Sequence, residues 1–142
     1  MKLVLIESPY RASTEWELTR NLAYLRALMF DCTQRGESPV AIHGLLTQVL
    51  DDRIPEERKL GIKCHIAWAR VADLIVVGID GGTSPGMIEG IKAHERNGFI
   101  VETRSLPGWR EAWSDSEVLS EICCRDKRNY LEPMWVPSTV RP

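Results

Sequence analysis

The chain lacks several features that would place it in a specialised class of protein. Its net charge is only −2, whereas proteins that bind duplex DNA or RNA normally carry a basic surplus. It contains no apolar run of about 18 residues, so the sequence predicts no membrane-spanning helix and no membrane partner. No C-x-x-C pair occurs among its four cysteines. Adjacent carboxylates such as Asp51 and Asp52 lie beside a helix start without a converging histidine, so we expect no metal site.

A targeting segment is also missing from the start of the chain. The sequence opens on the strand-like KLVLI instead of the basic, apolar and small-residue regions of a signal peptide, which favours a cytoplasmic protein. Free thiols are ordinary in that compartment, so we expect the four cysteines to be unpaired. With 142 residues and 44% hydrophobic residues, the chain is long enough to bury a core without disulfides.

Short apolar segments alternate with helix-like segments along most of the chain. The apolar segments predict strands over residues 2–6, 39–42, 73–79 and 99–101. Helix-start signals lie between them: a capping box from Thr14 to Glu17, and prolines at 55 and 85. This alternation predicts an α/β fold with a short parallel sheet of four to five strands flanked by helices. In the second helix we expect an inward-facing stripe that consists of Leu60, Cys64, Ala67, Trp68 and Val71.

The sequence after residue 106 is less regular than the part before it. We expect residues 1–106 to form the α/β domain, and residues 107–142 to form a C-terminal helix and an extended tail. This second part contains Trp109, Trp113 and Trp135, and large aromatic side chains often anchor interfaces. We therefore expect the tail to pack on the domain or on a partner subunit, in a homodimer or a larger homo-oligomer.

Ligands of parallel α/β sheets bind beyond the carboxyl ends of the strands, which here are followed by residues 7–13, 43–47 and 80–85. The stretch DGGTSPGMIEGIKAH over residues 80–94 is the most informative. Its glycines let a ligand approach the backbone, and the helix that starts at Ser84 and Pro85 offers free N–H groups to a phosphate or carboxylate. Glu89, one turn into this helix, either reaches the same crevice or is an exposed residue of a well-capped helix.

The three histidines differ in their expected surroundings. His43 follows the second predicted strand at the ligand edge, where it either donates to a ligand or caps the sheet. His65 lies on the second helix and is either structural or an acid–base group. His94 comes late in the third helix, away from the crevice, so we expect it at the surface.

Three segments in this order resemble the nucleoside 2-deoxyribosyltransferase-like superfamily: SPYR at 8–11, ADLIVVGID at 72–80 and SPGMIEGIKA at 84–93. HGLLTQVLDD and PEERKLGI are similar to its small phage-type branch in particular. The resemblance covers about residues 1–105 and implies a flavodoxin-like, Rossmannoid sheet. It also implies the host cytoplasm as the location if the chain is phage-encoded.

In enzymes of this superfamily a glutamate attacks C1′ of a nucleoside, displaces the base and leaves a glycosyl-enzyme for water or a second base to resolve. The resemblance implies Glu89 as this nucleophile, and it places His65 where relatives carry a catalytic aspartate. It implies a nucleoside or nucleotide ligand and no cofactor. The implied ligand-binding residues are Ser8, Pro9, Tyr10, Arg11, His43, Asp80, Gly82, Ser84, Gly86 and Met87.

Two classes of function follow from these observations. One is an enzyme that cleaves or exchanges the base of a (deoxy)nucleoside or its 5′-monophosphate through Glu89. The other is a non-catalytic phage protein that sequesters a host immune signalling nucleotide, which the replacement of the aspartate by His65 favours. A redox flavodoxin is a third and weaker interpretation, because SPYRAST only faintly matches a phosphate loop rich in serine and threonine.

Overall fold

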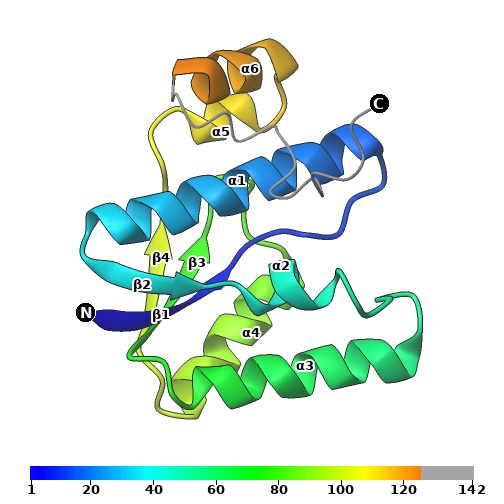
Figure 1. Cartoon of the computed structure of the whole chain (residues 1–142), viewed down its shortest axis with the longest axis vertical. Helices are drawn as coiled ribbons and strands as arrows, with labels where there is room; N and C mark the ends of the chain where they lie inside the picture. Colours follow the sequence, from blue (N-terminus) through cyan, green and yellow to red (C-terminus); the bar gives the residue numbers. More distant parts are fainter. Residues whose placement is uncertain (126–142) are drawn as a thin grey trace, which may run out of the picture.

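The computed structural model describes residues 1–125, which form a parallel sheet between two groups of helices (Figure 1). The sheet has four strands in the order β2-β1-β3-β4. The strands are β1 (Lys2–Glu7), β2 (Glu37–Val40), β3 (Leu74–Gly78) and β4 (Val101–Arg104). The helices are α1 (Glu15–Gln34), α2 (Ile42–Leu46), α3 (Pro55–Ala69), α4 (Pro85–Arg96), α5 (Trp109–Ala112) and α6 (Ser116–Arg125).

This architecture confirms the predicted α/β fold with a short, all-parallel sheet and helices on both faces. In Figure 1, α1, α5 and α6 lie on one side of the sheet, and α2, α3 and α4 lie on the other. All five residues of β3 are buried, as expected of a central strand that is covered on both faces. None of the helices in residues 1–125 has the length and apolar content needed to cross a membrane.

The three predicted helix starts are confirmed. Thr14 caps α1 by accepting a hydrogen bond from the Glu17 N–H at 3.1 Å, and the Glu17 carboxylate accepts from the Ser13 N–H at 2.6 Å. Both α3 and α4 begin with a proline, at positions 55 and 85. Proline is suited to the first turn because its fixed φ matches the helix and its missing N–H has no partner there.

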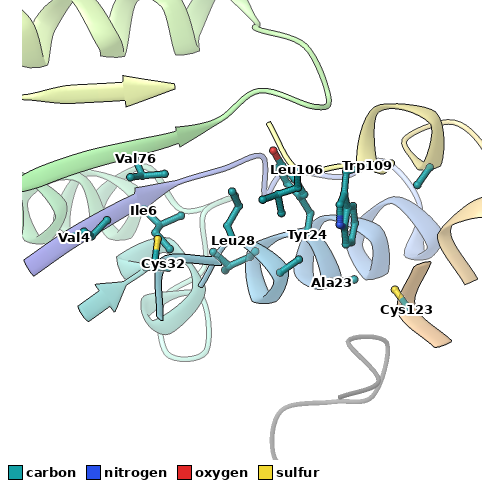
Figure 2. Close-up of a cluster of buried hydrophobic side chains, with 14 of the residues drawn as sticks. Val4, Ile6, Ala23, Tyr24, Leu28, Cys32, Val76, Leu106, Trp109 and Cys123 are labelled. Atoms are coloured by element: carbon teal, nitrogen blue, oxygen red, sulfur yellow. The ribbon is translucent and has the colours of Figure 1, made fainter. Parts of the chain in front are cut away.

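The larger core lies between α1 and the sheet. Figure 2 shows Tyr24 and Leu28 of α1 beside Val4, Ile6 and Val76 of the strands. A Cβ atom on Gly78 would lie 2.6 Å from Leu28 Cδ1 and 2.7 Å from the Tyr24 hydroxyl, so only glycine lets α1 approach β3 this closely.

Helices α5 and α6 extend this core at its outer end. The Trp109 ring lies 5.2 Å from the Tyr24 ring, and Trp113 lies 5.1 Å from it in an edge-to-face arrangement. The Arg20 guanidinium lies 4.3 Å from the centre of the Trp113 ring. Trp109 and Trp113 therefore pack within the chain itself, whereas Trp135 and the predicted extended tail lie outside the described residues.

The expected inward stripe of the second helix is confirmed only at Cys64, which packs against the smaller core, and is wrong at its other four positions. Leu60, Trp68 and Val71 are 50%, 47% and 59% exposed. The helix α3 instead turns Gly61, His65 and Ala69 inward, at a spacing of four residues that places them on one face. These smaller residues leave space for α2 and for a polar site, so the large apolar residues of α3 remain outside.

Two strand boundaries and one connection also differ from the prediction. The second strand is Glu37–Val40 instead of residues 39–42, and the fourth is Val101–Arg104 instead of 99–101. Part of the expected loop over residues 43–47 is helix α2. The ends of these two short strands are set by their pairing with β1 and β3 more than by their local sequence.

A buried ion-pair cluster joins three elements around Arg104 at the end of β4. Its side chain is 4% exposed and binds both carboxylate oxygens of Glu37, at 2.7 and 2.8 Å. It also pairs with Glu102 at 2.7 Å and with Asp31 of α1 at 3.4 Å. These hydrogen bonds, that of Glu37 above all, raise the pKa of Arg104 against the effect of burial.

Replacing Arg104 with methionine should destabilise the protein strongly, because it leaves the Glu37 carboxylate (11% exposed) without its cation. We expect the free energy of unfolding in urea to fall by about 3–5 kcal/mol. The control is Arg35→Met, since Arg35 also pairs with Asp31 but is 52% exposed, and its loss should change stability by no more than about 0.5 kcal/mol. Equal effects of the two variants would contradict this account of Arg104.

Candidate functional site

The site is organised around Glu7, the last residue of β1. Its carboxylate oxygen Oε1 lies 2.8 Å from His65 Nε2 of α3 and 2.5 Å from His94 Nε2 of α4. All three side chains are mostly buried, with exposed fractions of 21%, 20% and 12% for Glu7, His65 and His94. The carboxyl end of β1 is thereby tied to α3 and α4, two of the three helices on this face of the sheet.

The electrostatic balance keeps Glu7 ionised. Burial alone would raise its pKa, but hydrogen bonds and Coulomb attraction from His65, and then from His94, outweigh burial and hold the pKa below its usual value. A carboxylate can only accept hydrogen bonds. Both imidazole rings therefore donate to Oε1 through Nε2.

His43, the remaining histidine of the chain, lies in the same region. Its Nε2 lies 3.0 Å from the Ser8 hydroxyl oxygen, and its ring meets Tyr10 edge-on at 6.2 Å. Burial, helped by the neighbouring His65, lowers the pKa of His43 to about 4. His43 is therefore neutral at pH 7, so one of its ring nitrogens is a donor and the other an acceptor, and Nε2 is already engaged with Ser8.

A hollow lies beside these residues, between α2 and α3. Its volume is about 180 Å³, and its wall is largely apolar. Its polar lining residues include His43, His65, Asp52 and Arg58. The apolar part of the wall consists of Ile42, Leu46, Leu50, Gly61 and Ile62.

A second, more open hollow of about 470 Å³ adjoins the first. The two share Thr47, Leu50 and Asp52 as lining residues. Tyr10 lines the second hollow, so the loop after β1 reaches both the His43 ring and this outer space. The pair offers an apolar inner part and a polar outer part, which is the usual composition of a small-molecule site.

The structure brings together part of the predicted site. Ser8, Tyr10, His43 and His65 come from three separate segments and lie around Glu7 and the two hollows. Pro9, which stands between Ser8 and Tyr10 in the sequence, is half-buried, whereas Arg11 is exposed.

Asp80, another predicted ligand-binding residue, has structural partners on the opposite side of the sheet. Its carboxylate accepts hydrogen bonds from the Tyr24 hydroxyl at 2.5 Å, from the Ser105 hydroxyl and from the Leu106 N–H at 2.9 Å. It is 3% exposed, on the side of the sheet that α1 covers. In this structure Asp80 connects the loop after β3 to the loop after β4.

The residues at the start of α4 are exposed. Gly82, with a φ of 81° that favours glycine, turns the chain towards α4, and Gly86 lies in the first helical turn. Ser84 caps the helix by accepting a hydrogen bond from the Met87 N–H at 3.2 Å. The Met87 side chain packs beneath the sheet against the smaller apolar core.

Glu89 lies on the outward side of α4. Its side chain is 65% exposed and accepts a hydrogen bond from Arg96 at 2.8 Å. Met87 and His94 are seven residues apart and share the inward face, whereas Glu89 follows Met87 by two residues and points about 200° around the helix from it. The expected role of Glu89 as a nucleophile stays a prediction.

Sequence reasoning missed two residues of the site, Glu7 and His94. The expectation that His94 lies at the surface is wrong, because its side chain is 12% exposed and contacts Glu7. Its spacing of seven residues from Met87 is a signal that it shares the inward face. For Glu7 the signal is a charged residue directly after the apolar segment of residues 2–6, because a carboxylate at the end of a buried strand requires partners.

Three potential metal ligands converge at this point. One ligand atom from each of Glu7, His65 and His94 lies within 4.8 Å of the other two. Sequence spacing alone gave no reason to expect such a site, since the three residues lie on different elements.

The lowered pKa of His43 makes stability depend on pH. Its usual pKa is 6.5, so between about pH 4 and 6.5 the unfolded chain binds more protons than the folded one, and the free energy of unfolding rises with pH. We expect this rise to be about 1–3 kcal/mol larger in the wild type than in His43→Gln. In NMR titrations the His43 ring should titrate near pH 4, and a midpoint near 6.5 would contradict its burial in neutral form.

The comparisons with known proteins agree with the extent of the α/β fold. No curated protein and no solved structure matches the chain. One family model, described as a domain of unknown function (DUF7768), matches residues 2–104, which is from the first residue of β1 to the last residue of β4. Because this match spans most of the 142 residues, the chain belongs to the DUF7768 family.

Proposed function

We propose that the protein binds a nucleoside or nucleoside 5′-phosphate in the hollow between α2 and α3. The observation that carries this proposal is the convergence of four residues that the sequence analysis selected: Ser8, Tyr10, His43 and His65. Ser8 and Tyr10 follow β1, His43 lies in α2 and His65 lies in α3; the two histidines line the hollow.

The chemistry of the hollow suits a flat heterocycle. Ile42, Leu46 and Ile62 offer apolar surface on which a base can stack or pack. The neutral His43 ring supplies a donor or acceptor to the edge of the base. The hydrogen bond with the Ser8 hydroxyl fixes the orientation of the His43 ring. A ribose or phosphate would extend towards Tyr10 and the outer hollow, with the Arg58 guanidinium available to an anion.

Binding without cleavage is the version that the arrangement of α4 favours. Cleavage through a glutamate requires that carboxylate to approach C1′ of the bound sugar. Glu89 instead pairs with Arg96 on the exposed side of α4, and Met87 and His94 occupy the inward side. We therefore place the protein with the nucleotide-sequestering class, as a phage-type binder of a signalling nucleotide, and treat deoxyribosyltransferase or N-glycosidase activity as the competing outcome.

A retention assay tests this proposal. The purified protein is incubated with a panel of nucleosides, 5′-nucleotides and signalling nucleotides, and intact retained ligand and released base are measured together. We expect one intact ligand to be retained, and Leu46→Trp, which fills the hollow, to weaken retention at least tenfold. Glu89→Gln should retain the ligand as the wild type does. Base release that disappears in Glu89→Gln would establish the enzyme instead, and retention by neither variant nor wild type would remove the proposal.

The expected homo-oligomer also stays a proposal. Leu60 and Trp68 of α3, and Val71 just after it, expose apolar surface that a second copy of the chain would cover. We expect analytical ultracentrifugation to find a dimer or larger assembly, and Trp68→Glu to shift it towards monomer. A wild-type monomer at all concentrations would contradict this expectation.

A further inference from the structure

We propose that Glu7, His65 and His94 form a binding site for a divalent transition-metal ion of the zinc type. One carboxylate and two imidazoles are delivered by three rigid elements: the end of β1, the inward face of α3 and the inward face of α4. The proposal goes beyond nucleotide binding and does not rest on it.

The geometry is compatible with one ion. Each residue offers one ligand atom, and the three atoms lie within 4.8 Å of one another. Zinc binds imidazole nitrogen at about 2.0–2.1 Å and carboxylate oxygen at about 2.0–2.2 Å, so two ligand atoms of a tetrahedral zinc ion lie about 3.4 Å apart. Glu7 Oε1 now lies 2.8 and 2.5 Å from the two Nε2 atoms, so the ligand atoms must separate by less than about 1 Å to admit the ion. His65 Nε2 and His94 Nε2 both already point at Glu7 Oε1, so only small rotations are needed to open room for the ion.

The ligand types select the metal. Two imidazoles and one carboxylate are a common set for zinc and for other first-row transition metals, whereas magnesium and calcium prefer oxygen ligands alone. Three protein ligands leave a fourth position for water or for a group of a bound ligand, as in catalytic zinc sites. Because His65 also lines the hollow, the ion would lie next to the proposed small-molecule site.

Metal binding would require a defined proton rearrangement. In the metal-free protein, both rings carry a proton on Nε2 and donate it to the ionised Glu7 carboxylate. To bind the ion, each neutral ring must move its proton to Nδ1 and present the Nε2 lone pair, and a protonated ring must release one proton to solvent. Occupancy should therefore fall on acidification.

The alternative is a purely structural role. A buried carboxylate costs free energy unless it is paired, and two donating histidines meet that need without any ion. The two interpretations differ in one respect that can be measured: only the metal site predicts stoichiometric uptake of zinc that is lost when Glu7 or His94 is replaced.

The test uses the full chain freed of metal by chelation and titrated with Zn²⁺ and, separately, with Co²⁺. We expect one Zn²⁺ per chain, and visible d–d bands for Co²⁺ without the near-ultraviolet band of a cobalt–thiolate bond. Glu7→Gln and His94→Gln should each lower the affinity for Zn²⁺ by about 100-fold or more, since even the loss of an outer hydrogen-bond partner costs about 10–100-fold.

Two controls separate this site from adventitious binding. Glu95→Gln removes an exposed carboxylate next to His94 and should leave zinc binding unchanged, and Mg²⁺ should not compete. If Glu7→Gln fails to fold, His94→Gln and the wild-type Co²⁺ spectrum still decide the question. A thiolate band, which would point to a cysteine such as Cys64 or Cys124, overturns the proposal, and so does zinc binding that survives both substitutions.

The metal and nucleotide proposals fail in distinguishable ways. Zinc is titrated into protein without nucleotide, and nucleotide retention is measured both with chelator and with Zn²⁺. If Leu46→Trp loses nucleotide retention but still takes up zinc, nucleotide binding and zinc binding are two separate properties of the site. Absence of zinc uptake overturns the metal site whatever the outcome for nucleotides.

Discussion

The buried charge of Glu7 is the constraint on which this face of the molecule depends. A carboxylate at the end of a central strand is stable only if the surrounding elements supply donors to it. The helices α3 and α4 supply them through His65 and His94, at 2.8 and 2.5 Å. One side chain thus fixes the rotation of two helices relative to the sheet, and it gathers polar groups where a ligand can reach them.

The two faces of the sheet have different roles. On the α1 side, Tyr24, Trp109 and their neighbours form a large apolar core, and the polar residues Asp80 and Arg104 are fully engaged with partners inside the fold. On the α3 side the core is smaller, and Gly61 and His65 leave space that the hollow occupies. Stability is concentrated on the first side, which leaves the second free to carry polar chemistry.

The sequence predicted the fold better than the site, for a physical reason. Strand and helix periodicity are local properties, so the α/β alternation and the helix starts at Thr14, Pro55 and Pro85 could be predicted and are confirmed. A parallel sheet binds its ligands at the loops after the carboxyl ends of its strands, so Ser8 and His43, which lie in such segments, could also be predicted as candidates. The rotation of α3 and α4 depends instead on tertiary partners. That dependence explains why the large apolar residues of α3 were placed inward and why His94 was placed at the surface.

We infer that Glu7 assembles a site able to hold one transition-metal ion between β1, α3 and α4. Its most direct test is anomalous diffraction at the zinc absorption edge, from crystals grown with one equivalent of Zn²⁺. The account predicts one strong anomalous peak at about 2.0–2.2 Å from Glu7 Oε1 and from the Nε2 atoms of His65 and His94. A crystal in which both histidines still donate to Glu7 and the peak is absent, or lies at other residues, would contradict it.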